Sequence, residues 1–167
     1  MMRGLQWGAG MDVYCVNRKE FISHDRDEGS FGSHVAWDAD ALFIIPKEMK
    51  SEHAGPLMCG GATVWGALSQ YNLKATDRVG VIGIGGLGHL AIQFASKMGC
   101  EVIAFSGTES KKAEALAFGA TEFVATKGLK DLKHIGKMNQ LLITTSEQPD
   151  YDLYILCNDG LLILKVP

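Results

Sequence analysis

From residue 79 onward, the chain alternates between short apolar runs and segments with helical spacing. Residues 79–83 form an apolar run that ends in glycine, and in 87–98 apolar residues recur at helical spacing on one face. This pattern predicts a strand followed by an amphipathic helix. Gly99 stands where a glycine usually ends a helix. The first unit of the alternation is therefore a strand, a glycine turn and a helix.

Further apolar runs extend this alternation to the end of the chain. They predict strands at 101–105, 122–125, 141–144 and 161–164, and a second helix at 110–118 that stops at Gly119. Such alternation is typical of a parallel sheet with helices on both faces. We therefore predict an α/β fold, a doubly wound Rossmann sheet of about five strands in the order 3-2-1-4-5. The fifth strand leaves one sheet edge without a partner, an edge that invites pairing with another chain, and a homodimer is one assembly that this allows.

The first 50 residues lack this regularity and contain several Gly and Asp residues. Short runs at 33–37 and 42–45 predict strands there. The small residues of 52–71 predict a helical segment that packs closely against its neighbours. We expect three regions: an irregular β-containing domain remnant at 1–52, a connecting helical region at 53–76, and an incomplete Rossmann domain at 77–167.

Composition and charge narrow the functional classes. Hydrophobic residues make up 47% and charged residues 21% of the chain, which is ordinary for a globular protein. The net charge is −3, and no block of like charge favours nucleic-acid binding. No apolar stretch reaches membrane-spanning length, and the N-terminus lacks a signal-peptide pattern. The cysteines are widely spaced, so we expect a reducing, cytoplasmic setting rather than a disulfide framework.

The glycine pattern at Gly83, Gly85 and Gly88 has the spacing and context of a dinucleotide-binding fingerprint. Gly83 permits a tight turn, Gly85 lets the backbone approach a pyrophosphate, and Gly88 lets the helix pack close to the strand. The helix N-terminus then offers free N–H groups to the phosphates. The alternatives are a strand-to-helix turn with no ligand and a different ligand of a Rossmann fold, and the surrounding strand and helix pattern favours the dinucleotide.

The end of the second strand distinguishes the two nicotinamide cofactors. An acidic residue at the strand tip binds the ribose 2′-hydroxyl of NAD, whereas hydroxyl and cationic residues accept the 2′-phosphate of NADP. This tip carries Ser106, Thr108 and Lys111, which favour NADP. Glu109 is the counter-evidence, and a solvated helix start is the alternative interpretation of Lys111.

Four segments together resemble a known enzyme family. They are residues 56–65, 77–89, 105–112 and 118–120. The chain is similar to the zinc-dependent medium-chain alcohol dehydrogenases, and most similar to the cinnamyl-alcohol-dehydrogenase-like branch, which generally uses NADP. The resemblance implies that 1–52 derives from a GroES-like catalytic domain. It also implies hydride transfer between nicotinamide and a primary alcohol or aldehyde, with zinc binding the substrate oxygen.

Site residues follow from this resemblance position by position. Cys59 matches a ligand of the catalytic zinc, Cys15 resembles a cysteine of a structural-zinc loop, and Thr63 lies in the segment that lines the nicotinamide end. The pyrophosphate loop corresponds to Gly83, Gly85, Gly86, Leu87 and Gly88. The 2′-phosphate region corresponds to Ser106, Gly107, Thr108 and Lys111. A threonine pair after the fourth strand, Thr144 and Thr145, belongs to the family's cofactor region.

The sequence also departs from the family. The other catalytic ligands and three structural-zinc cysteines have no counterpart before Cys15, and the C-terminal strand of the family is absent. We therefore expect a fragment or an altered gene product.

The histidines are expected to be surface or second-shell residues rather than replacement ligands: His24, His34, His53, His89 and His134. The alternative function is a non-catalytic NADP(H)-binding module. A zinc-free quinone reductase is disfavoured by the cysteine in the Leu-Met-Cys-Gly-Gly segment.

Overall fold

The computed structural model describes residues 32–34, 39, 42–155 and 162–166. The chain divides into two compact units, Met1–Glu48 and Met49–Pro167. The predicted strand at 42–45 is wrong, because these residues pair with no other described strand and their side chains are exposed, Ile44 by 97%. Apolar alternation cannot form a strand without a partner backbone. The predicted strand at 33–37 lies mostly outside the described residues.

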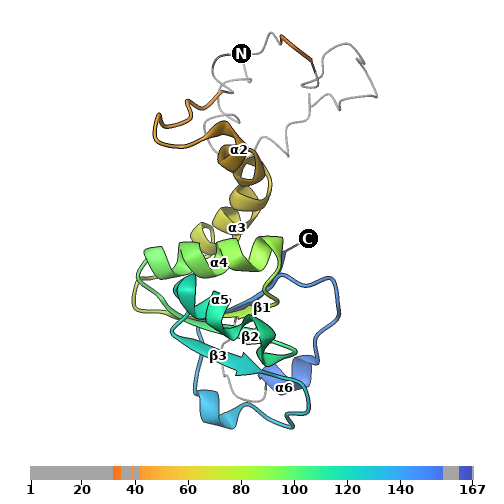
Figure 1. Cartoon of the computed structure of the whole chain (residues 1–167). Coiled ribbons are helices and arrows are strands. Elements are labelled where there is room, and N and C mark those ends of the chain that lie inside the picture. Colours follow the sequence, from red (N-terminus) through yellow and green to blue (C-terminus); the bar gives the residue numbers. More distant parts are fainter. Residues whose placement is uncertain (1–31, 35–38, 40–41, 156–161, 167) are drawn as a thin grey trace, which may run out of the picture. The chain divides into compact units, whose positions relative to one another are not determined.

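The second unit is built on a five-stranded parallel sheet in the order β3-β2-β1-β4-β5. Figure 1 shows the neighbouring strands β1, β2 and β3 of this sheet. Its strands are β1 Arg78–Ile82, β2 Glu101–Ser106, β3 Glu122–Ala125, β4 Gln140–Ile143 and β5 Leu162–Lys165. The fold class and the strand order that the alternation predicts are therefore confirmed. The strand order reverses between β1 and β4, and such a switch point is where open α/β sheets bind ligands.

Helices connect the strands and cover the sheet. The helices of this unit are α2 Ser51–Ala54, α3 Gly60–Ser69, α4 Gly86–Lys97, α5 Lys112–Ala117 and α6 Tyr151–Ile155, with 3-10 turns η3 Gly55–Met58, η4 Glu109–Lys111 and η5 Lys133–Ile135. The helical segment expected at 52–71 is therefore present, in three pieces. The short α6 and η5 were not predicted. In the part of the chain that the structure describes, no helix is long and apolar enough to span a bilayer.

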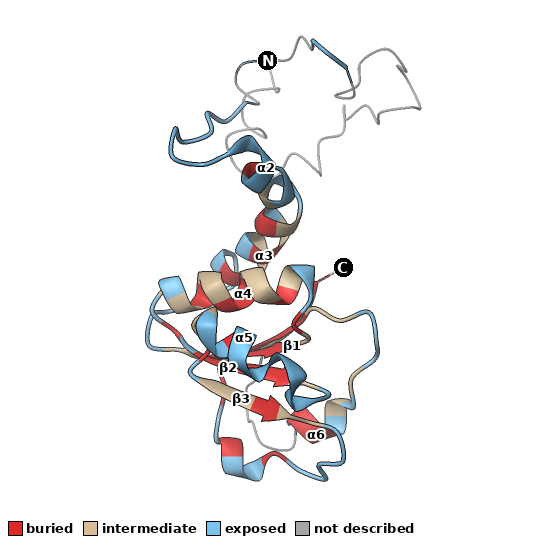
Figure 2. Cartoon of the chain, in the orientation of Figure 1, coloured by how far each residue is buried: buried red, intermediate tan, exposed pale blue. Residues whose placement is uncertain are grey.

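Alternation along each strand sends successive side chains to two separate apolar cores. Most residues of β1 and β2 are buried (Figure 2). In β2, Val102 and Ala104 pack with α3 and α4, whereas Ile103 and Phe105 pack on the other side with α6 and η5. The central strands are buried on both faces, as parallel sheets require. The two cores hold the strand ends in a fixed relation to one another.

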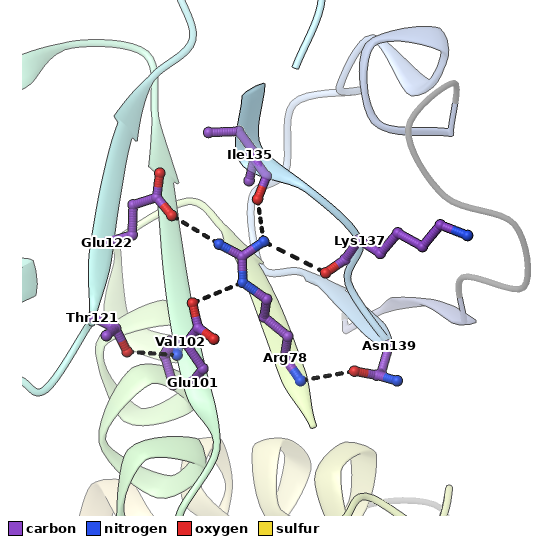
Figure 3. A network of polar contacts seen from close by, with 8 residues as sticks. All are labelled: Arg78, Glu101, Val102, Thr121, Glu122, Ile135, Lys137 and Asn139. Atoms are coloured by element: carbon purple, nitrogen blue, oxygen red, sulfur yellow. Dashed lines mark hydrogen bonds and ion pairs between the residues drawn. The ribbon is translucent and has the colours of Figure 1, made fainter. Parts of the chain in front are cut away.

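Arg78, the first residue of β1, joins the amino ends of three strands (Figure 3). Its guanidinium donates to Glu101 at 2.8 Å, to Glu122 at 2.9 Å and to the carbonyl oxygen of Ile135. Its backbone N–H donates to Asn139 Oδ1 at 2.8 Å. Charge-assisted hydrogen bonds of this kind are among the stronger polar contacts in proteins. The network links the amino ends of these strands, at the end of the sheet opposite the glycine loop.

Candidate dinucleotide site

The glycine loop follows β1 at the carboxyl edge of the sheet, as predicted. Gly83 has a φ of +89°, a conformation that residues with a side chain rarely adopt, and its N–H donates to the carbonyl of Phe105 at 3.0 Å. A Cβ on Gly88 would lie 1.9 Å from the carbonyl oxygen of Gly83. The first glycine therefore makes the turn, and the last lets α4 contact it.

Side chains hold four successive carbonyl groups of this segment. Thr144 Oγ1 lies 2.9 Å from the carbonyl oxygens of both Ile82 and Gly83. Lys111 Nζ donates to the oxygen of Ile84 at 2.6 Å, and His89 Nδ1 lies 3.1 Å from that of Gly85. The donors come from the residue after β4, from η4 and from α4, so three parts of the chain fix the orientation of the loop peptides. The donors are Thr144, Lys111 and His89.

Fixed carbonyls leave the N–H groups on the opposite side of each peptide plane in fixed positions. Gly86, Leu87 and Gly88 form the first turn of α4, where backbone N–H groups have no partner within the helix. A Cβ built on Gly85 or Gly86 would meet no heavy atom within 4 Å. The loop therefore offers N–H groups and close access, which is what binding a phosphate requires.

The tip of β2 lies next to this loop. Ser106 ends β2 and is half-buried, whereas Gly107, Thr108 and Lys111 are exposed. The ammonium of Lys111 uses one of its three donors on the loop, which leaves two for another acceptor. The acidic residue of this turn, Glu109, is paired with the ammonium of Lys112 at 3.3 Å. The turn therefore presents hydroxyls and one ammonium beside the loop.

A cavity of about 640 Å³ lies along one side of the glycine loop. Its volume falls in the usual range for small-molecule sites. The cavity is lined by Glu52, His53, Pro56, Leu57 and Gly60 from α2 to α3, by Gly86, Leu87, His89 and Leu90 of α4, and by Thr144. Thr145 lies beside Gly83, where a Cβ on the glycine would be 3.1 Å from the threonine Cβ. The structure therefore places the predicted glycine-loop residues next to the predicted threonine pair, Thr144 and Thr145.

Of the two predicted zinc ligands, Cys59 lies within the described residues and Cys15 does not. Cys59 is an exposed thiol at the start of α3, Thr63 lies one turn further along that helix, and Cys15 is outside the described residues. Among residues 32–34, 39, 42–155 and 162–166, no three His, Cys, Asp or Glu side chains group as a metal site would require. The described residues therefore do not by themselves form a zinc site.

Two features of the site were not expected from the sequence. No partner was predicted for His89, which contacts both the loop and the ring of Phe118, with 5.5 Å between the two ring centroids. Lys111 was expected near a phosphate, and its bond to Ile84 was not foreseen. The position of His89 four residues after Gly85 was a usable signal, because such pairs meet on a helix.

Comparisons with known proteins agree with this geometry. A profile described as zinc-binding dehydrogenase matches residues 86–157. An aldehyde reductase of Synechocystis sp. is 39% identical over 91% of this chain and 48% of its own length. An NADP-dependent alcohol dehydrogenase C of Mycolicibacterium smegmatis is 31% identical over 93% of this chain and 47% of its own. The chain spans about half the length of these curated relatives.

A solved structure shows the same similarity in three dimensions. The CAD from Helicobacter pylori, in a structure complexed with NADP(H), superimposes with a TM-score of 0.62 and 29% sequence identity. The superposition covers 74% of this chain and 35% of that one. Sequence and structural similarity therefore agree on one family.

Proposed function

Because the chain belongs to the zinc-dependent medium-chain alcohol dehydrogenase family, we propose that residues 77–167 are its dinucleotide-binding domain and that the glycine loop binds NADP(H). The observation that carries this proposal is the loop itself. Three side chains contact its carbonyl oxygens. The first turn of α4 offers backbone N–H groups, and there is open space beside Gly85 and Gly86. This is the arrangement that a pyrophosphate requires.

NADP rather than NAD is the proposed cofactor. The ammonium of Lys111 has two N–H donors left for another acceptor beside the β2 tip. The carboxylate of Glu109, which would favour the ribose hydroxyl of NAD, is paired with Lys112. Ser106, Gly107 and Thr108 complete the proposed 2′-phosphate region. A neutral ribose hydroxyl would instead favour a free carboxylate at the strand tip. Relatives described as NADP-dependent or complexed with NADP(H) support the same preference.

The whole protein is proposed to interconvert alcohols and aldehydes. The bound nicotinamide would supply or accept a hydride at the substrate carbon. The residues of this chain would hold the dinucleotide: Gly86 and Leu87 donate backbone N–H groups to phosphate, Lys111 binds the 2′-phosphate, and Thr144, Thr145 and Thr63 border the cofactor. The cavity of about 640 Å³ beside α4 offers room for the ligand.

A second candidate function concerns this chain taken alone: it binds NADP(H) without catalysis. The observation in its favour is the isolated Cys59, which has no grouped metal ligands among the described residues. Cys59 and Cys15 therefore remain proposals as zinc ligands that need further donors.

The test is a set of four measurements on the purified chain. We expect NADPH to raise the melting temperature and to bind more tightly than NADH in a calorimetric titration. Metal analysis should give well below one zinc per chain, and reduction of benzaldehyde or cinnamaldehyde should be absent. Failure of millimolar NADPH to stabilise the chain would contradict the proposed function. Aldehyde reduction that a chelator abolishes would reject the non-catalytic alternative.

A further inference from the structure

Gly85 has the one loop carbonyl that is held by a side chain of α4 itself. Its oxygen accepts the backbone N–H of His89 at 3.0 Å and lies 3.1 Å from the Nδ1 atom of the same residue. A carbonyl oxygen can only accept hydrogen bonds, so Nδ1 must carry the proton. The proton on Nδ1 is present in the imidazolium and in one neutral tautomer, so this contact does not require a charged ring.

The imidazole ring is itself held in place from a second side. The ring of Phe118 lies 5.5 Å from it, centroid to centroid, at an interplanar angle of 50°. His89 is half-buried and also lines the cavity beside the loop. A side chain that is packed in this way loses less freedom when it makes its hydrogen bond. The bond to Gly85 is therefore part of a fixed arrangement.

The peptide that joins Gly85 to Gly86 contains both the carbonyl that His89 contacts and the N–H that faces the proposed phosphate site. Its oxygen is the acceptor for His89, and its N–H belongs to Gly86, the first residue of α4. Because the peptide is planar, fixing the oxygen also fixes the direction of the N–H. Neither glycine has a side chain to restrict this peptide, so its orientation depends on the two contacts of its oxygen, one with the backbone N–H of His89 and one with the imidazole.

We propose that His89 is a positioning residue of the dinucleotide site, which orients the Gly86 N–H towards the pyrophosphate by holding the carbonyl of Gly85. The inference rests on the proposed function, because it assumes that the loop binds a pyrophosphate. It assigns His89 a role in affinity for the phosphates, not in contact with the adenine or its 2′-phosphate. That distinction makes the role measurable.

Two substitutions separate the hydrogen bond from the packing. His89→Phe keeps an aromatic ring against Phe118 and removes the donor. His89→Gln restores a donor at the same position, and Gln93 shows that glutamine can do this, since its Nε2 donates to the carbonyl of His89 four residues earlier at 3.2 Å. Each variant is titrated with NADPH and with adenosine 2′-monophosphate, which has the 2′-phosphate but no pyrophosphate. Melting temperatures without ligand report whether the fold is intact.

We expect His89→Phe to weaken NADPH binding about 3- to 10-fold, the effect of one lost hydrogen bond. Its affinity for adenosine 2′-monophosphate should stay within about twofold of the wild type. His89→Gln should recover most of the loss. Equal losses for both ligands, unchanged NADPH binding in His89→Phe, or no recovery in His89→Gln would overturn the inference. A wild-type chain that does not bind NADPH would instead overturn the proposed function.

Discussion

The ammonium of Lys111 lies 2.6 Å from the carbonyl oxygen of Ile84, across a sequence separation of 27 residues. This bond links the turn after β2 to the turn after β1. In the proposed function, those two turns bind the 2′-phosphate and the pyrophosphate of one cofactor. Lys111 thus belongs to both parts of the site, which leads to a prediction with two components.

Lys111→Met should weaken NADPH binding about tenfold or more, because charge-assisted hydrogen bonds to the 2′-phosphate are lost. NADH binding should fall about threefold or less, since it loses only the support given to Ile84. Calorimetric titration of both cofactors measures the difference. Lys97→Met is the matched control, because Lys97 is an exposed lysine in the last turn of α4, at the end of that helix away from the glycine loop. Equal losses for NADPH and NADH would show that Lys111 does not select the cofactor.

Gly88→Ala should lower the free energy of unfolding by about 2–3 kcal/mol or more. The new Cβ would lie 1.9 Å from the backbone oxygen of Gly83, and a backbone atom can move away only if α4 shifts. Urea unfolding measures the change. Gly86→Ala is the contrasting variant, since its Cβ meets nothing within 4 Å. It should fold normally yet bind NADPH more weakly, because the methyl group occupies the proposed path of the pyrophosphate.

Arg78→Met should lower the free energy of unfolding by about 1–3 kcal/mol without a direct effect on the cofactor site. The substitution leaves Glu101, Glu122 and the Ile135 carbonyl without their shared donor at the amino edge of the sheet. Arg78→Lys should recover only part of the loss, because one ammonium cannot reproduce the forked geometry. Full recovery by lysine would mean that charge alone matters there.

Stability should fall at alkaline pH partly through Cys100. Burial, and to a smaller extent the charge of Asp77, raise the pKa of this thiol above its ordinary value of 9.0. The folded state therefore holds the proton more tightly than the unfolded state. The resulting stability is present below pH 9.0 and is lost as the pH rises through the folded-state pKa.

The check is urea unfolding at several pH values above 8 for the wild type and for Cys100→Ala. The cavity left by the alanine lowers stability at every pH, whereas the loss of the thiol makes the decline with pH shallower. Burial also raises the pKa of Tyr154, and its contribution remains in both proteins. Parallel curves for the two proteins would remove Cys100 as a source of the pH dependence.

Local patterns were sufficient to predict most of the Rossmann sheet. The strand at 122–125 begins and ends as predicted, and Gly99 and Gly119 both have the positive φ expected where a helix stops. These features depend on residues close together in the chain. The strand at 42–45 failed because pairing depends on distant backbone, and α6 was missed because its five residues are too few to show a helical period.

The sequence by itself determined the glycine turn, because the spacing of Gly83, Gly85 and Gly88 meets a steric requirement within a few residues. It also determined the order of the strands, since connections between parallel strands follow few topologies. Only the tertiary structure decided what holds the loop. The contacts of Thr144 and Lys111 with its carbonyls cross 61 and 27 residues of sequence, and they exist because the parallel sheet brings the carboxyl ends of β1, β2 and β4 to one edge.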